Sequence, residues 1–363
     1  MSLDNSPKAV SNFIKGNRIY IFMLAVIIAV NLLSIQGVLH KEETEAVGQK
    51  KISRIMDKEE MLAREKRIKE ILEEKKFLAI TLKASLFLLA LALAAGLILS
   101  IRCLALRLNG RNLMAAYGSP PDVNWDLLDI LKVVIIFYFF GYALQLFEIM
   151  GFYLLDIKEP DERIAAVLNT TLMDILGFSA VLYFVIKKYK RTLVDLGIFF
   201  KNLLRDIKIG FIAYVTVLPV LFLVIIFVFV ILQLVKYEPP SVPLFELFYE
   251  ESRPTLLFVL TILVTFLGPI AEEVFFRGFA YPVLRRRLGI RNAIILISFV
   301  FALLHTNLIG LLPILALGIL LAYLYEKTGS LIPSITVHMI HNLIIVYWVH
   351  LYKTVVISTS SIY

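Results

Sequence analysis

GPIAEEVFFRGF, residues 268–279, places two adjacent carboxylates and an arginine directly after an apolar run. That run, TLLFVLTILVTFL at residues 255–267, has no charged residue and is long enough to enter a lipid bilayer deeply. An ionisable side chain inside a membrane is energetically costly, so its presence there marks a functional site. The stretch therefore predicts a membrane helix that carries a functional site.

The composition indicates a membrane protein. Of the 363 residues, 59% are hydrophobic and only 18% are charged, whereas an average soluble domain is about a quarter charged. The net charge of +8 comes from basic residues clustered in short loops between apolar runs, which indicates topology signals and contacts with anionic lipid rather than nucleic acid. The single cysteine, Cys103, excludes a disulfide within the chain and a zinc site built on several thiolates.

Apolar runs of spanning length recur along the chain and predict an all-α polytopic transmembrane helix bundle of about eight to nine spans. In lipid every backbone polar group must be bonded within the chain, so these runs are expected to be helices. The first run is not followed by a cleavage site of the A-x-A type, so we expect a retained anchor. The expected spans cover roughly residues 19–39, 77–101, 127–155, 165–186, 207–235, 255–285, 292–304, 311–325 and 331–349.

Charge patterning divides the chain into two parts. Residues 1–126 hold the anchor span, a charge-dense segment at about 40–76 and the second span, while residues 127–363 form the transmembrane core. Apolar residues in the segment 40–76 recur at roughly helical spacing, which favours an amphipathic helix feeding into the next span, with a coiled coil or substrate-docking arm as the alternative. Basic loops after the second, fourth and sixth spans predict an N-terminus inside. We expect a multi-pass protein of a bacterial or archaeal cell membrane.

The two glutamates of the opening stretch are expected to have different partners. On a helix Glu273 and Arg277 are i,i+4 neighbours, and an ion pair between them would offset much of the cost of burying each. Glu272 lies about 100° away round the helix and faces another surface. A carboxylate beside an ion pair but not consumed by it is a candidate general base. Pro269 is expected to loosen the helix one turn earlier, making room for water or a substrate strand.

Further polar residues occur in the last apolar helices, namely His305, His338, His341 and Asn342. A neutral imidazole can position a water molecule or donate a proton, and an asparagine amide can donate to a developing oxyanion. Any one of them alone is more often a contact between helices than a catalytic group. Together with the two acids and the arginine, on three apolar spans, they indicate water attack on a carbonyl carbon.

Three short motifs resemble those of the CAAX protease and bacteriocin-processing (CPBP, or Abi) family of intramembrane proteases, which includes the CAAX prenyl endopeptidases of the Ras-converting type. Their order and intervals are similar to the family's, and the resemblance covers about residues 195–346. Glu273 and Arg277 match positions that look supporting, and His341 matches no motif position. The motifs are Glu272-Glu273-x-x-x-Arg277, Phe301-x-x-x-His305 and His338-x-x-x-Asn342.

The resemblance implies an all-helical core with the site in a conical or enclosed cavity inside the membrane. It implies an intramembrane glutamic endopeptidase that hydrolyses a peptide bond of a membrane-associated protein or peptide. Glu272 would then be the carboxylate that activates water, with His305 assisting. His338 and Asn342 would complete the site and stabilise the oxyanion. No cofactor and no metal are expected.

Several alternatives stay open. The sequence lacks the His-Glu-x-x-His, Gly-x-Ser-Gly and Gly-x-Gly-Asp motifs of other intramembrane proteases. A metal is an alternative because Glu272, His305 and His338 are ligand types, and His338-x-x-His341 can chelate. A non-catalytic scaffold or immunity protein that binds peptides or lipids would keep the same helices. A proton-coupled transporter fits less well, because the polar residues concentrate in the last four spans and no inverted repeat is visible.

Overall fold

The computed structural model describes residues 7–45, 66, 69–111, 117–155, 161–237, 243–305 and 309–360. These residues form helices joined by turns and short loops, and they contain no strand. Eight helical segments among them are long and apolar enough to cross a membrane. This confirms the predicted all-α polytopic bundle and an integral membrane protein. Most of the charged segment 40–76 lies outside the described residues.

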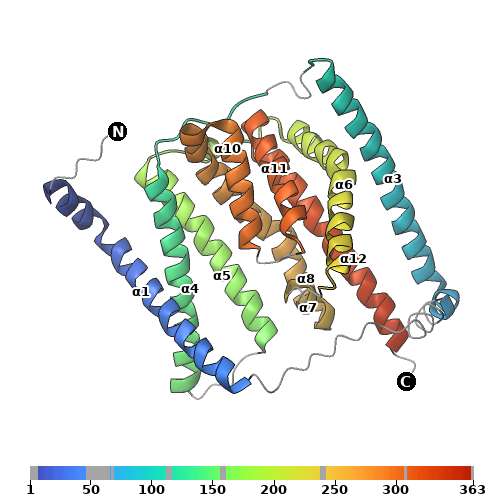
Figure 1. Ribbon diagram of the computed structural model, residues 1–363, viewed down its shortest axis with the longest axis horizontal. Helices are drawn as coiled ribbons and strands as arrows, with labels where there is room; N and C mark the ends of the chain where they lie inside the picture. The colour runs from blue at the N-terminus through green and yellow to red at the C-terminus, as the bar shows by residue number, and fades with distance from the viewer. Residues whose placement is uncertain are drawn as a thin grey trace. The chain divides into compact units, whose positions relative to one another are not determined.

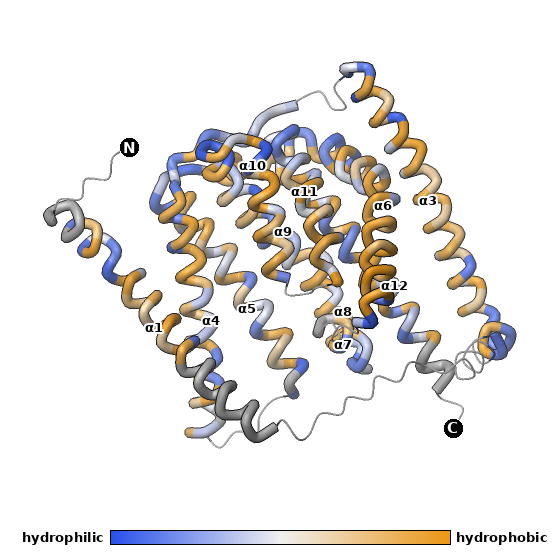
Figure 2. Tube along the Cα trace, viewed as in Figure 1, coloured by the Kyte–Doolittle hydropathy of each residue, from blue (hydrophilic) through white to orange (hydrophobic). Residues whose placement is uncertain are grey.

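Figure 1 shows the helices coloured in chain order from the N-terminus to the C-terminus. Figure 2 shows that α6 is hydrophobic along nearly its whole length, as is expected of a helix that spans a membrane. The α-helices are α1 (Pro7–Glu45), α3 (Lys76–Leu108), α4 (Leu127–Leu155), α5 (Glu162–Leu182), α6 (Leu203–Leu234), α7 (Pro243–Glu250), α8 (Pro254–Ile262), α9 (Gly268–Glu273), α10 (Tyr281–Leu304), α11 (Leu311–Thr328) and α12 (Ile332–Ser360). Short segments of other winding are the π-helical η1 (Tyr183–Lys188), η3 (Leu263–Leu267) and η4 (Val274–Ala280), and the 3-10 helix η2 (Leu193–Leu196).

The chain divides into two compact units. The first holds α1, α4 and α5, with α4 packed against both of the others. Within it the buried Asp129 accepts hydrogen bonds from Lys188 and Tyr189. The second unit holds α3 and α6 to α12, and therefore all of the predicted site residues. The predicted division of the chain at residues 126 and 127 stays a prediction.

The core of the second unit lies where α6, α11 and α12 meet. Its fully or nearly buried side chains are apolar except for one tyrosine hydroxyl, so it is held by close packing rather than by polar contacts. Ala213, Val217 and Ile340 pack against it from its edges. The buried members of this cluster are Tyr214, Leu221, Leu317, Leu321, Leu324 and Val337.

The close approach of α6 to α12 gives a first prediction. A Cβ atom on Gly210 in α6 would lie 2.6 Å from the carbonyl oxygen of Pro333 and 2.8 Å from Thr336 Cβ, both in α12. We expect Gly210→Ala to lower the unfolding temperature of the purified protein by several degrees, because overpacking costs about 1–3 kcal/mol. Gly16→Ala is the control, since nothing lies within 4 Å of a Cβ there, and it should not lower that temperature. Equal unfolding temperatures for Gly210→Ala and the unmodified protein would contradict this packing.

Gly289 reverses the direction of the chain between the first motif, in α9 and η4, and the second motif, at the end of α10. Its φ of 76° and ψ of 168° interrupt α10, and this backbone region is essentially restricted to glycine. On either side of it the rings of Phe276 and Phe301 meet edge to face with centroids 5.1 Å apart. A straight helix would separate these residues by about 37 Å. The apolar segment Pro254–Leu304 is therefore folded back on itself and contains both spans expected at 255–285 and 292–304.

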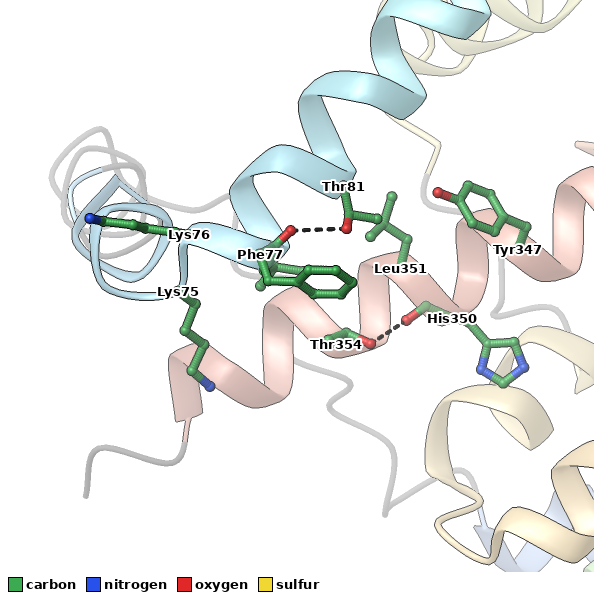
Figure 3. Close-up of a pocket in the computed structure, with 9 residues that line it drawn as sticks. Lys75, Lys76, Phe77, Thr81, Tyr347, His350, Leu351 and Thr354 are labelled. Atoms are coloured by element: carbon green, nitrogen blue, oxygen red, sulfur yellow. Dashed lines mark hydrogen bonds between the residues drawn. The ribbon is translucent and has the colours of Figure 1, made fainter.

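A groove of about 650 Å³ lies between the start of α3 and the second half of α12. Figure 3 shows Phe77 and Thr81 of α3 on one side of it and Leu351 of α12 on the other. Leu351 also belongs to a small hydrophobic cluster with Ile71 and Leu78. The groove is not lined by any of the predicted site residues. The enclosed cavity expected around those residues stays a prediction.

Candidate active site

The segment with the two glutamates is not a uniform α-helix. The helix α9 has only six residues and lies between the π-helical segments η3 and η4. In η3 the N–H of Gly268 donates to the carbonyl of Leu263, five residues earlier in the chain. π-helical turns inside α-helices occur frequently at functional sites, and they widen the helix locally. Glu272 and Glu273 are therefore held on a short α-helical turn with a widened turn on each side.

Glu273 and Arg277 form the ion pair that their i,i+4 spacing predicts. Arg277 Nη1 donates to Glu273 Oε1 at 2.8 Å, and both side chains are 0% exposed. Arg277 Nη2 donates to the carbonyl of Gly318 at 3.3 Å, and the guanidinium carbon lies 4.4 Å from the centre of the Phe301 ring. A buried charge needs a partner and further hydrogen bonds. This pair has both, while Glu273 Oε2 and Arg277 Nε are buried without a hydrogen-bond partner among the described residues.

Glu272 carries the carboxylate that the ion pair does not use. Its Oε2 lies 3.9 Å from His305 Nε2 and 3.8 Å from His338 Nε2. These distances are too long for hydrogen bonds, and Oε2 is buried without a hydrogen-bond partner among the described residues. The side chain of His338 is 3% exposed, while those of Glu272 and His305 are each 34% exposed. Three of the predicted site residues, from α9, the end of α10 and α12, thus lie close together, with both histidine Nε2 atoms within 4 Å of Glu272 Oε2.

The second ring nitrogen of each histidine is already engaged. His338 Nδ1 lies 3.0 Å from Glu273 Oε1, and His305 Nδ1 lies 2.8 Å from the carbonyl oxygen of Phe301. A carbonyl and an ion-paired carboxylate can only accept, so both Nδ1 atoms carry the proton. In the neutral histidines both Nε2 atoms then present a lone pair. We call Glu272 Oε2 and these two Nε2 atoms the acceptor cluster; a water molecule, with two O–H donors, would suit it.

The other polar residues of α12 have different neighbours. Asn342 follows His338 by one turn, and its Nδ2 donates to the carbonyl of Val264 in η3 at 2.8 Å. His341 lies against α6, where its Nδ1 is 3.4 Å from Tyr214 Oη and the two rings meet edge to face with centroids 6.0 Å apart. His341, for which no role was predicted, therefore lies outside the acceptor cluster.

Comparison with known protein families places these residues in a known context. The family model described as type II CAAX prenyl endopeptidase Rce1-like matches residues 254–344. This segment is similar to the Rce1-like family. The match confirms the predicted resemblance and supports a CAAX-type intramembrane protease in general. It covers about a quarter of the chain and begins at residue 254 rather than near residue 195. The comparisons with curated proteins and with solved structures found no match.

The Rce1-like segment also contains residues whose part in the site was not predicted. The ring of Phe301 lies 4.6 Å from the ring of His305 and 5.7 Å from that of His338, so it forms a wall shared by both histidines. The sequence did carry a signal for Phe301, because it lies four residues before His305 and is the first residue of the second motif. Val264 and Gly318 contribute backbone carbonyls, for which a sequence carries no signal because every residue has one.

The Rce1-like segment contains the residue types that a metal would bind. Among the described residues, however, no three histidine, cysteine, aspartate or glutamate side chains lie close enough together to hold a metal ion. The spacing of His338 and His341 would allow them to chelate a metal, but their side chains have different neighbours. His338 faces Glu273, and His341 faces Tyr214. The expectation that the protein uses no metal and no cofactor stays a prediction.

Proposed function

We propose that the protein is an intramembrane glutamic endopeptidase that hydrolyses a peptide bond of a membrane-associated protein or peptide. The observation that carries the proposal is the acceptor cluster, in which a carboxylate and two imidazole lone pairs face one another with no donor between them from the part of the chain that the structure describes. A single water molecule there would donate one hydrogen to Glu272 and the other to a histidine Nε2. Its oxygen would then present a lone pair away from these residues.

In the proposed reaction Glu272 acts first as general base and then as general acid. As the water oxygen bonds to the carbonyl carbon, one water proton moves to Glu272 and the carbonyl π electrons move to the carbonyl oxygen. His305 Nε2 accepts the other hydrogen of the water and orients it. When the tetrahedral intermediate collapses, the C–N bond breaks and the proton on Glu272 passes to the departing amine. The products are a carboxylic acid and an amine, and the enzyme is restored.

Stabilising the oxyanion requires hydrogen-bond donors that already point toward its position before the reaction starts. Asn342 has a second amide N–H beside the one that it gives to Val264. His338 contributes in its imidazolium form, in which Nε2 has taken up a proton from solvent before the reaction and keeps it throughout, because Glu273 at its Nδ1 then balances the charge. Both side chains come from α12, one turn apart, so they approach the substrate from the same side.

A turnover assay with the purified protein in lipid nanodiscs tests the proposal. The matched family is described by its CAAX prenyl endopeptidases, so the first substrates are membrane-anchored peptides ending in Cys-a-a-X, each with and without a prenyl group. We expect cleavage that a strong chelator does not stop. Loss of cleavage on chelation, with recovery on adding zinc, would replace the glutamate mechanism with a metal-dependent one. A folded protein that binds these peptides without cleaving them would instead support the non-catalytic scaffold.

A further inference from the structure

The carbonyl of Val264 lacks a donor from its own helix. In η3 the N–H of Gly268, which would reach this carbonyl in an α-helix, donates to Leu263 instead. The next residue, which would reach it in a π-helix, is Pro269 and has no N–H. In a membrane helix an unbonded carbonyl is costly. Asn342 Nδ2 instead donates a hydrogen bond to the Val264 carbonyl oxygen, at a distance of 2.8 Å.

We propose that Asn342 is a positioning residue, which holds the π-helical turn before Glu272 by supplying the hydrogen bond that Pro269 cannot make. The effect of this role on hydrolysis rests on the proposed function, but its effect on the stability of the turn does not. Asn342 thus acts through Val264 in addition to any contact that it makes with the oxyanion.

The geometry of the helix explains why this turn matters for the site. A π-helical turn winds in one extra residue, so every later residue is turned by about 100° relative to a continuous α-helix. If η3 relaxed to an α-helix, Ala271 would take roughly the angular place of Glu272, and Glu272 would move toward that of Glu273. The turn at Val264 therefore decides whether Glu272 faces His305, whereas Glu273 and Arg277 both follow the turn and would rotate together as a pair.

A double-mutant cycle between Asn342→Ala and Pro269→Ala tests the proposal. In the Pro269→Ala background residue 269 regains an N–H that can serve the Val264 carbonyl. We expect Asn342→Ala alone to lower the unfolding temperature and to reduce kcat about tenfold or more with little change in KM. In the Pro269→Ala background the same change should have less than half of its effect on the unfolding temperature. Equal effects in both backgrounds would overturn the proposal and leave Asn342 as an oxyanion donor alone.

A second variant keeps the test decisive if Pro269→Ala does not fold. Asn342→Leu keeps about the size of the side chain but removes every donor, so it should lower the unfolding temperature and reduce kcat as Asn342→Ala does. An unchanged unfolding temperature and kcat for Asn342→Leu would show that no donor is needed. Asn17→Ala is the control: Asn17 Nδ2 also donates to a helix carbonyl, that of Phe13 at 2.8 Å, but at an exposed site, and its loss should change neither quantity. Because unfolding temperatures do not depend on turnover, a protein without peptidase activity would still show the coupling.

Discussion

Glu272→Gln is expected to reduce the kcat of peptide hydrolysis by a factor of about 10²–10⁴ while the protein stays folded. Glutamine has nearly the same size as glutamate, but its amide cannot take a proton from water. The substitution breaks no hydrogen bond of Glu272 Oε2, because that atom has none among the described residues. The new amide N–H can donate to His305 or His338, whose Nε2 atoms are 3.9 and 3.8 Å from the carboxylate oxygen. The unfolding temperature should therefore be unchanged or slightly higher.

The measurement is single-turnover and steady-state cleavage of a membrane-anchored peptide, together with a thermal unfolding curve. Glu70→Gln is the matched control, because the Glu70 side chain is 62% exposed and pairs with Lys66 at 4.0 Å. It should leave kcat and the unfolding temperature as they are. Cleavage by Glu272→Gln at an undiminished rate would remove Glu272 as the base, and a collapsed unfolding curve would mean that the carboxylate supports the fold.

Removing either member of the buried ion pair is expected to have the largest effect on stability. Arg277→Ala leaves the 0% exposed Glu273 carboxylate with His338 as its one partner among the described residues, and Glu273→Ala leaves a buried guanidinium without its carboxylate. Breaking a buried pair in this way costs about 3–5 kcal/mol, which is comparable to the whole stability of many domains. We expect low yields from membranes, a strongly reduced unfolding temperature and little cleavage.

The pair Lys66–Glu70 supplies the control for this experiment. It has the same i,i+4 spacing, but its side chains are 81% and 62% exposed, so Lys66→Ala should cost at most about 0.5 kcal/mol. Replacing both members of the buried pair by apolar residues of similar size should be less harmful to folding than either single change, because no charge is then left alone. Normal yields and unfolding temperatures for both single variants would contradict the burial of this pair.

Much of the helical framework could be predicted from the sequence. A bilayer demands about twenty apolar residues per span and internal bonding of every backbone group, so the apolar runs could only be helices. The pairing of Glu273 with Arg277 was predictable for the same kind of reason, since the spacing of four residues on a helix brings two side chains together whatever the rest of the chain does.

The convergence of the site was harder to predict, because it depends on contacts between helices. Glu272 and His305 approach each other because Gly289 folds the segment back, and a glycine alone does not announce a reversal. The motif resemblance suggested that these residues act together but not how their protons are arranged. That arrangement depends on Glu273 and on the Phe301 carbonyl, which hold the Nδ1 atoms of the two histidines.

By itself, the sequence determined a bundle of membrane helices, an ion pair on one helix face and a set of polar residues too large for helix contacts alone. These properties are local, since they follow from the length, hydropathy and spacing of residues along one helix. Only the tertiary structure decided that three acceptors meet with no donor between them among the described residues, and that Asn342 bonds the carbonyl left open before Pro269. Hydrogen bonds between helices are short-ranged and directional, so an added residue in one turn rotates every later side chain to new partners.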